Sequence, residues 1–234
     1  TLDVARRYKA NAAIVAESTG LELIVAHKGF VWLDVETIGV AAHGSRPDLG
    51  VDAIAKMGRV LTELEMLDQV LRLNPTHKLL QSGSVHASLI RGGQELSSYP
   101  ERCTLSVERR TIPGETPEHV EAELNDIVRR IRAADPAFKA VVRRGLDRAP
   151  LETPEDAPIV ATIRDSAARV LGAPPEVAGA PYWTDAASLW SAGIPSVLFG
   201  PVGAGAHAVE EWVDLASIQA CVDIFITTAE EFCK

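Results

Sequence analysis

The sequence predicts an α/β protein in which a small α+β domain interrupts a larger α/β domain. Between Phe30 and Val142 the hydrophobic patterns follow the order β-α-β-β-α-β, which is the ferredoxin-like split βαβ unit. Two short apolar strands precede this stretch, and after it helical patterns alternate with short strands, as in layered α/β folds. We therefore assign residues 29–144 to the inserted domain, and residues 1–28 and 145–234 to a discontinuous α/β domain.

The first elements are two short apolar strands. Residues 12–16 (AAIVA) form a run typical of a buried strand, and Glu17 stands at its end. A second strand is expected at residues 21–26. Glu17 is therefore placed where a strand of the larger domain ends.

The inserted domain follows in order. Alternation over 30–38 predicts a half-buried strand, and apolar residues at three- and four-residue spacing predict a helix over 50–71. Thr116 and Pro117 are typical of a helix start, as N-cap and first helical residue. The remaining expected elements are strands over 84–90, 103–111 and 138–142 and a helix over 116–134.

After the inserted domain the helices and strands alternate again. The predicted elements are a helix over 158–171, a strand over 176–178, a helix over 185–192, a strand over 196–199 and a helix over 214–232.

The stretch after residue 199 is the most informative of the chain. A glycine-rich turn (Gly200, Gly203, Gly205) leads directly to His207. Glycine lets the backbone approach a ligand closely, and ligands of open α/β sheets bind beyond the carboxyl ends of strands. His207 is thus a candidate metal ligand or proton carrier. The alternative is a strand–turn–helix connection with a surface histidine.

Composition and charge restrict the classes of function that the protein can have. The 234 residues include 23 Lys and Arg against 32 Asp and Glu, a net charge of −9, which argues against nucleic acid as a partner. We expect no membrane span, because no apolar run reaches the required length. The three cysteines (Cys103, Cys221, Cys233) form no CxxC pair, which favours a reducing, cytoplasmic compartment.

Five segments together resemble the M20 metallopeptidases, the group of acetylornithine deacetylase, succinyl-diaminopimelate desuccinylase and carboxypeptidase G2. They are AIVAEST, KGFVWLDVETIGVAAHGSRPDLGVDAI, VERRTIPGE, WTDA and GIPSVLFGPVGAGAH, and they span nearly the whole chain. The resemblance implies a zinc-peptidase-like catalytic domain, here partial, with an inserted ferredoxin-like lid domain that forms a homodimer. It also implies two zinc ions, with cobalt or manganese as alternatives.

The resemblance assigns roles residue by residue. Glu17, in a Glu-Ser-Thr version of the family's Glu-Pro-Thr motif, and His207 match metal ligands of different zinc ions. His43 matches the lid histidine that reaches the partner's site and stabilises the oxyanion; its alternative is a turn histidine. Ser97 stands where many relatives have Asn.

The same resemblance indicates residues for substrate binding. Arg110 matches a carboxylate-binding arginine, although Arg109 competes for that place, and Arg148 aligns loosely with another. Thr184 and Asp185 match a Thr-Asp pair beside the substrate, with helix capping as the alternative. Gly203 and Gly205 belong to the loop along the substrate backbone. We expect structural or solvated roles for His27, His77, His86 and His119.

Other residues of the family's site are not found. Its N-terminal histidine, bridging aspartate and Glu-Glu pair precede the Glu17 motif, and the 16 residues before Glu17 hold only one acid, Asp3. We therefore expect a chain that lacks the N-terminal portion, is inactive by itself, and associates through exposed apolar surface.

The favoured function is zinc-dependent hydrolysis of the amide bond of N-acyl amino acids or small peptides. Two alternatives stay open: a di- or aminopeptidase of the same family, and a non-catalytic dimerisation or binding module with the same fold. A serine or cysteine hydrolase is disfavoured, because no GxSxG segment is present.

Overall fold

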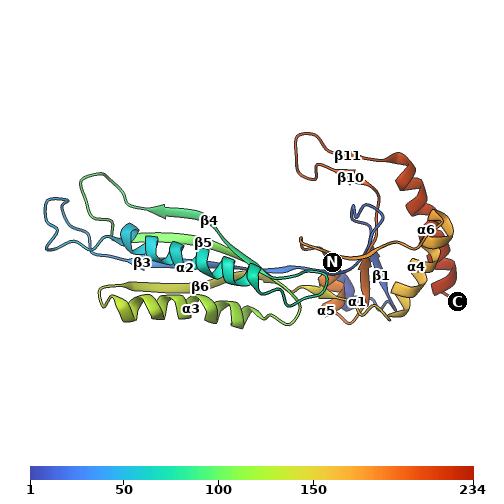
Figure 1. Ribbon diagram of the computed structural model, residues 1–234, viewed down its shortest axis with the longest axis horizontal. Coiled ribbons are helices and arrows are strands. Elements are labelled where there is room, and N and C mark those ends of the chain that lie inside the picture. The colour runs from blue at the N-terminus through green and yellow to red at the C-terminus, as the bar shows by residue number, and fades with distance from the viewer. The chain divides into compact units, whose positions relative to one another are not determined.

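The computed structural model describes residues 1–234 and contains six helices and eleven strands (Figure 1). The helices are α1 (Leu2–Arg7), α2 (Ala53–Leu73), α3 (Pro117–Ala134), α4 (Pro158–Leu171), α5 (Ala186–Ser191) and α6 (Leu215–Phe232). The strands are β1 (Ala13–Val15), β2 (Leu23–His27), β3 (Gly29–Ile38), β4 (Ser84–Gly92), β5 (Arg102–Thr111), β6 (Lys139–Arg148), β7 (Leu151–Glu152), β8 (Val177–Ala180), β9 (Ser196–Leu198), β10 (Gly203–Ala204) and β11 (Trp212–Val213). None of these helices has both the length and the apolar character of a membrane span.

The chain divides into two compact units. One unit is Gly29–Arg148, and the other combines Thr1–Lys28 with Ala149–Lys234. The second boundary therefore lies four residues beyond the predicted position at 144. The reason is that β6 is longer than the predicted strand over 138–142, because its pairing with β3 continues as far as Phe30 and Arg148.

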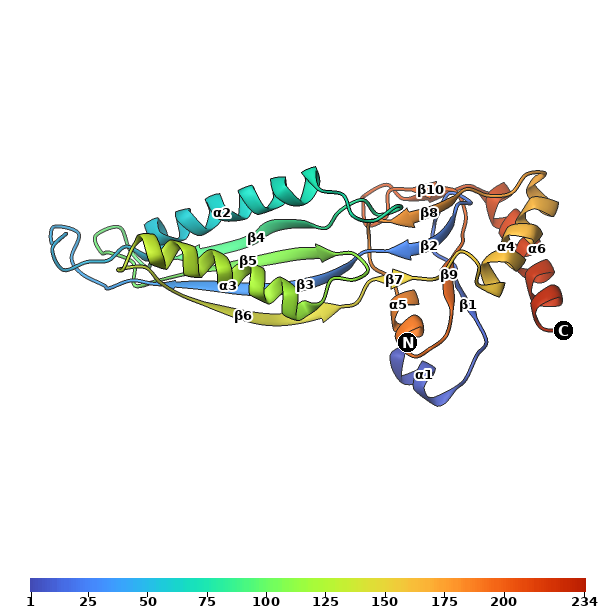
Figure 2. The ribbon, with the colours of Figure 1, turned by 60° about the horizontal axis from the view of Figure 1, so that its bottom comes forward.

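The unit Gly29–Arg148 is an antiparallel sheet with two helices on one face. The strand order is β4-β5-β3-β6, and the elements follow the predicted order βαββαβ. Figure 2 shows α2 and α3 in front of the same face of this sheet. Inward side chains of β3 and β5, among them Val31, Leu33 and Leu105, pack there with Met57 of α2 and Leu124 of α3.

Capping residues define where both helices begin. Thr116 caps α3 by accepting a hydrogen bond from the backbone N–H of His119 at 3.1 Å, and Pro117 is the first helical residue, as predicted. Helix α2 begins at Ala53 rather than near residue 50. Val51 pairs with Val40 in a short antiparallel bridge, and Asp52 then caps the helix.

The other unit contains a mixed sheet flanked by helices. Its strand order is β1-β9-β2-β7, and β8 also pairs with β2. β1 runs parallel to β9 and β8 runs parallel to β2, whereas β7 is antiparallel to β2. Helices α4 and α6 pack against each other (Figure 1). The α/β class with an inserted βαββαβ unit is thus confirmed.

The structure adds elements that the patterns did not predict. Helix α1 and the short strand β7 are new, and the glycine-rich turn forms part of a hairpin, β10–β11. A strand of two residues gives too short an alternation to be recognised. Along α6, the side chains of Leu215, Val222 and Ile226 are exposed by 77%, 44% and 54%.

Candidate active site

Glu17 lies two residues beyond the carboxyl end of β1, in an exposed position. The two residues after it hold the segment in place. Ser18 donates a hydrogen bond to the carbonyl oxygen of Pro201 at 3.0 Å. Thr19 accepts one from the backbone N–H of Gly200 at 3.0 Å and donates to the carbonyl of Glu22 at 2.7 Å. The Glu17-Ser18-Thr19 segment is therefore fastened to the loop that follows β9.

Two glycines make this contact sterically feasible. A methyl carbon at Gly200 would lie 1.8 Å from the carbonyl oxygen of Glu17. At Gly203 it would lie 2.7 Å from the carbonyl of Trp212 and 3.1 Å from the hydroxyl of Ser18. Close backbone approach explains both glycines. The two predicted segments, far apart in sequence, thus lie side by side.

His207 lies in the turn of the β10–β11 hairpin. Its φ is +63°, a left-handed conformation that is uncommon for a residue with a side chain and that often marks functional sites. Gly205, with φ +84°, begins this turn, because the N–H of Ala208 bonds to its carbonyl at 2.8 Å. The imidazole is held out at an exposed position.

Thr184 and Asp185 stand at the start of α5. The capping alternative holds for Thr184 only: its hydroxyl accepts a hydrogen bond from the N–H of Ala186 at 3.3 Å, and its side chain is buried. Asp185 makes no side-chain cap bond, because its own backbone is already helical. The Asp185 carboxylate is exposed.

Sequence reasoning missed Tyr182, which joins this loop to the Glu17 segment. Its hydroxyl donates to the carbonyl of Ser18 at 3.4 Å. Burial, and then the negative charges of Glu17 and Glu22, raise the pKa of Tyr182. The phenol is thus in the electrostatic field of the candidate ligand Glu17. The position of Tyr182 in the sequence, two residues before Thr184, was the signal that could have marked it as part of the candidate site.

His27 is fully buried at the end of β2. Its Nδ1 donates to the carbonyl of Lys28 at 3.0 Å, and its ring meets Trp183 edge-on with centroids 6.5 Å apart. Burial lowers the pKa of His27, so the ring is neutral and structural, as expected.

In the unit Gly29–Arg148, His43 lies on the loop between β3 and α2. This loop pairs with the β4–β5 loop: His43 bridges to Ser98, and the N–H of Gly44 donates to the carbonyl of Ser97 at 2.6 Å. The Nδ1 of His43 accepts from the backbone N–H of Ser45 at 3.2 Å and lies 2.7 Å from the Ser45 hydroxyl. A neutral His43 therefore carries its proton on Nε2, which is left as a hydrogen-bond donor.

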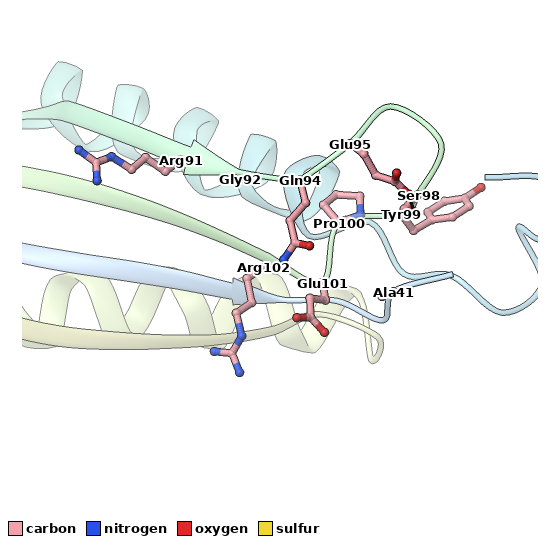
Figure 3. A pocket seen from close by; sticks show the side chains of 11 residues that line it. Ala41, Arg91, Gly92, Gln94, Glu95, Ser98, Tyr99, Pro100, Glu101 and Arg102 are labelled. Carbon is pink, nitrogen blue, oxygen red and sulfur yellow. Dashed lines mark hydrogen bonds between the residues drawn. The ribbon is translucent and has the colours of Figure 1, made fainter. Parts of the chain in front are cut away.

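Beside this loop pair lies a pocket of about 440 Å³, whose lining includes Ala41, Glu95, Tyr99 and Arg102 (Figure 3). Figure 3 shows Arg91 and Arg102 pointing away from Tyr99. The ring of Tyr99 occupies the space that a Cβ at Gly50 would need, 2.4 Å from its Cγ. This packing fixes the loop that carries His43.

The two competing arginines have different environments. Arg109 is fully buried and bonds to Glu115, at 2.5 Å, and to Glu123, at 3.1 Å. Arg110 is partly exposed, pairs with Glu108 at 2.6 Å, and lies 5.6 Å from the ring centre of Phe30. Of the two, only Arg110 has a side chain that an external carboxylate could reach. Arg148 is exposed at the end of β6, in the inserted unit.

The arrangement therefore unites the Glu17 segment, the glycine loop and the Tyr182–Asp185 loop within one unit. His43, Arg110 and Arg148 belong to the other unit. No three His, Cys, Asp or Glu side chains gather closely enough to hold a metal ion. The residues present do not by themselves form a zinc site, which usually needs three or four protein ligands.

The chain is similar in sequence and in fold to several known enzymes. Residues 25–136 match a family model described as the M20 peptidase dimerisation domain. An acetylornithine deacetylase of Myxococcus xanthus is 30% identical over 228 residues, which cover 96% of this chain and 58% of that protein. The N-formyl-4-amino-5-aminomethyl-2-methylpyrimidine deformylase of Bacillus subtilis is 26% identical and covers all of this chain; the match spans 61% of the deformylase. The aminopeptidase PepT of Bacillus cereus has a similar fold, with a TM-score of 0.81, 18% identity, and coverage of 98% of this chain and 59% of its own.

Proposed function

Because the chain belongs to the M20 metallopeptidase family, we propose that the complete protein is a metal-dependent hydrolase of amide bonds in N-acyl amino acids. The observation that carries the proposal is the close packing of the Glu17 segment on the Gly200–Gly205 loop that leads to His207. The deacetylase and deformylase relatives favour an N-acyl substrate over a peptide.

Glu17 and His207 are the proposed metal ligands in this chain, with zinc as the ion. A carboxylate and an imidazole are suitable donors for zinc. The chain spans 58% of the length of its deacetylase relative, so we assign the other ligands and the general base to residues outside these 234.

His43 is the proposed catalytic donor. Its Nε2–H is free to bind the oxygen that becomes negative when water attacks the amide carbonyl, and one such donor typically supplies about 3 kcal/mol. In a dimer this donor would serve the partner's site, as the family resemblance implies.

Substrate binding is assigned to the remaining candidates. The planar guanidinium of Arg110 suits the free carboxylate of an amino acid, with Arg148 as a further candidate. Asp185, buried Thr184 and the backbone of Gly203 and Gly205 would line the substrate. The three free cysteines support a reducing, cytoplasmic compartment.

The test uses the complete protein, assayed with N-acetyl-L-ornithine and with a dipeptide, together with its metal content. We expect faster turnover of the acetylated amino acid. His43→Ala should lower kcat about a hundredfold or more with metal retained. Glu17→Gln and His207→Ala should lose metal as well as activity.

His119→Ala is the matched control, since this histidine is exposed on α3, and it should change neither readout. Preference for the dipeptide would favour the peptidase alternative. A folded complete protein that turns over neither substrate and binds no metal would leave the non-catalytic binding module as the answer.

The inserted unit is the proposed homodimer interface. β4 is an edge strand, and α2, which packs against it, exposes Met66, Val70 and Leu73 by 46%, 55% and 79% on its outward face. The other edge strand, β6, carries Arg143 and Arg144, and charged side chains oppose edge pairing. The β4 edge and the outward apolar face of α2 are therefore the favoured contact with a second copy.

Sedimentation velocity checks the dimer. The chain is expected at twice its mass of 25.1 kDa, and Val70→Glu should shift it to the monomer. Asn125→Glu, which adds the same charge to the exposed side of α3, should leave the dimer intact. A monomeric wild type, or an unchanged Val70→Glu variant, would contradict this interface.

A further inference from the structure

The sheet of the inserted unit has a groove on the face opposite α2 and α3. This open-face groove has a volume of about 430 Å³, and its lining includes Trp32, Asp34, Leu89, Ser106, Glu108 and Leu146. The lining residues Trp32 and Asp34 alternate along β3 with Val31 and Leu33, which pack into the core beneath α2 and α3 (Figure 2). Small-molecule sites commonly have this size and combine apolar walls with a few polar groups.

Irregularities in the two edge strands shape the groove. The β4–β5 register shifts between Ala87 and Leu89, and the β3–β6 register shifts between Val31 and Leu33. Ser88 and Gly145, which line the groove, lie at these irregularities. β-Bulges bend a strand and redirect its side chains, and they are frequent beside binding sites.

Trp32 forms a fixed aromatic platform in the groove. Its side chain is 47% exposed, which is unusual for so large an apolar group in the middle of a strand. The indole Nε1 donates to Glu108 at 2.7 Å, and Glu108 is held in turn by Arg110 at 2.6 Å. Phe30 packs beside the indole, with ring centres 5.2 Å apart. The ring is therefore held in place while it stays open to a ligand.

The charge in the groove is negative. Asp34 and Glu108 are its charged lining residues, and none is basic. Arg110 neutralises Glu108, so Asp34 carries the remaining charge, with a hydrogen bond from the Ser106 hydroxyl at 2.7 Å. Arg143 lies opposite Asp34 in the β3–β6 pairing, but its guanidinium pairs with Glu36 at 3.6 Å.

We propose that the open-face groove binds a small organic cation, an ammonium group with apolar substituents. The cation would lie over the face of Trp32, the aromatic ring that attracts cations most strongly, with Asp34 as its counter-ion. Leu89 and Leu146, exposed by 59% and 41%, would contact the substituents. This site lies within the inserted unit; it shares Arg110, which neutralises Glu108, with the residues proposed to bind the substrate, but it does not depend on the proposed hydrolysis.

The test compares choline with 3,3-dimethyl-1-butanol, its neutral isostere, on the whole chain. Binding is followed through the indole N–H resonance of Trp32 in two-dimensional NMR spectra. Choline should shift this resonance in a saturable way, and the neutral alcohol should bind about threefold more weakly or worse.

Two variants locate the site. Asp34→Asn should weaken choline binding about threefold, and Trp32→Leu should abolish binding as followed by ligand-observed NMR. Asp126→Asn is the control, because it removes an exposed acid of the same unit from α3, away from the groove, and it should bind choline as the wild type does. If the Trp32→Leu variant fails to fold, the choline affinity of Asp34→Asn alone tests the proposal.

Three results would overturn the proposal. They are equal binding of the two probes, no shift with either probe, and choline binding that survives unchanged in Asp34→Asn.

Discussion

Replacing Arg109 with methionine is expected to destabilise the inserted unit by about 3 kcal/mol. The guanidinium is completely buried, and it holds two carboxylates, Glu115 and Glu123, which are themselves only 18% and 16% exposed. Removing the cation leaves both acids in a poorly solvated position without their partner. Urea unfolding followed by circular dichroism measures the change.

The residues around Arg109 leave space for its guanidinium and stabilise its charge. A methyl carbon at Gly83 would lie 2.0 Å from the Nη1 of Arg109, so only glycine leaves room for the guanidinium there. Burial opposes the charge, but the hydrogen bonds and charges of Glu115 and Glu123 outweigh it and raise the pKa of Arg109. The ion pair is thus formed at any pH at which both acids are ionised.

Two further variants separate charge from packing. Arg129→Ala breaks an ion pair with Asp126 whose arginine is 74% exposed, and it should change stability by less than about 1 kcal/mol. The triple variant Arg109→Met, Glu115→Gln, Glu123→Gln should recover part of the loss, because no unpaired charge remains. If Arg109→Met and Arg129→Ala had the same effect, the buried pair would not be a stabilising feature.

Replacing Gly200 with alanine is expected to destabilise the larger unit by about 2 kcal/mol or more. The new methyl group would overlap the carbonyl oxygen of Glu17, at 1.8 Å. Because the obstacle is backbone, no side-chain rotation can relieve it. The Glu17 segment and the glycine loop would have to separate, so metal binding by the complete protein should weaken along with thermal stability.

Gly58→Ala is the matched control. Gly58 lies within α2, and a methyl group there would meet nothing within 4 Å. Alanine is favoured over glycine inside a helix, so this variant should gain about 0.5 to 1 kcal/mol. Opposite signs for the two Gly→Ala changes are expected in thermal unfolding. A neutral Gly200→Ala would mean that the Glu17 segment does not depend on this contact.

Local signals predicted the inserted unit well. The Thr-Pro start of α3 and the alternation of β3 depend on short-range physics, namely capping bonds and a side-chain period of two. Where long-range pairing decides, the predictions were less accurate. β6 extends to Arg148 because β3 offers it a partner, and α2 starts late because Val51 is held by Val40.

For the candidate site, too, local features could be predicted from the sequence, whereas burial and contacts could not. The sequence by itself determined which residue types stand at strand ends and turns: Glu17 after β1, the glycines before His207, and His43 before α2. Only the tertiary structure decided that Arg109 is buried and Arg110 accessible, that Thr184 rather than Asp185 caps α5, and that Tyr182 lies beside the Glu17 segment. The physical reason is that neighbouring residues have the same local pattern, whereas burial and partners depend on segments that are distant in the chain.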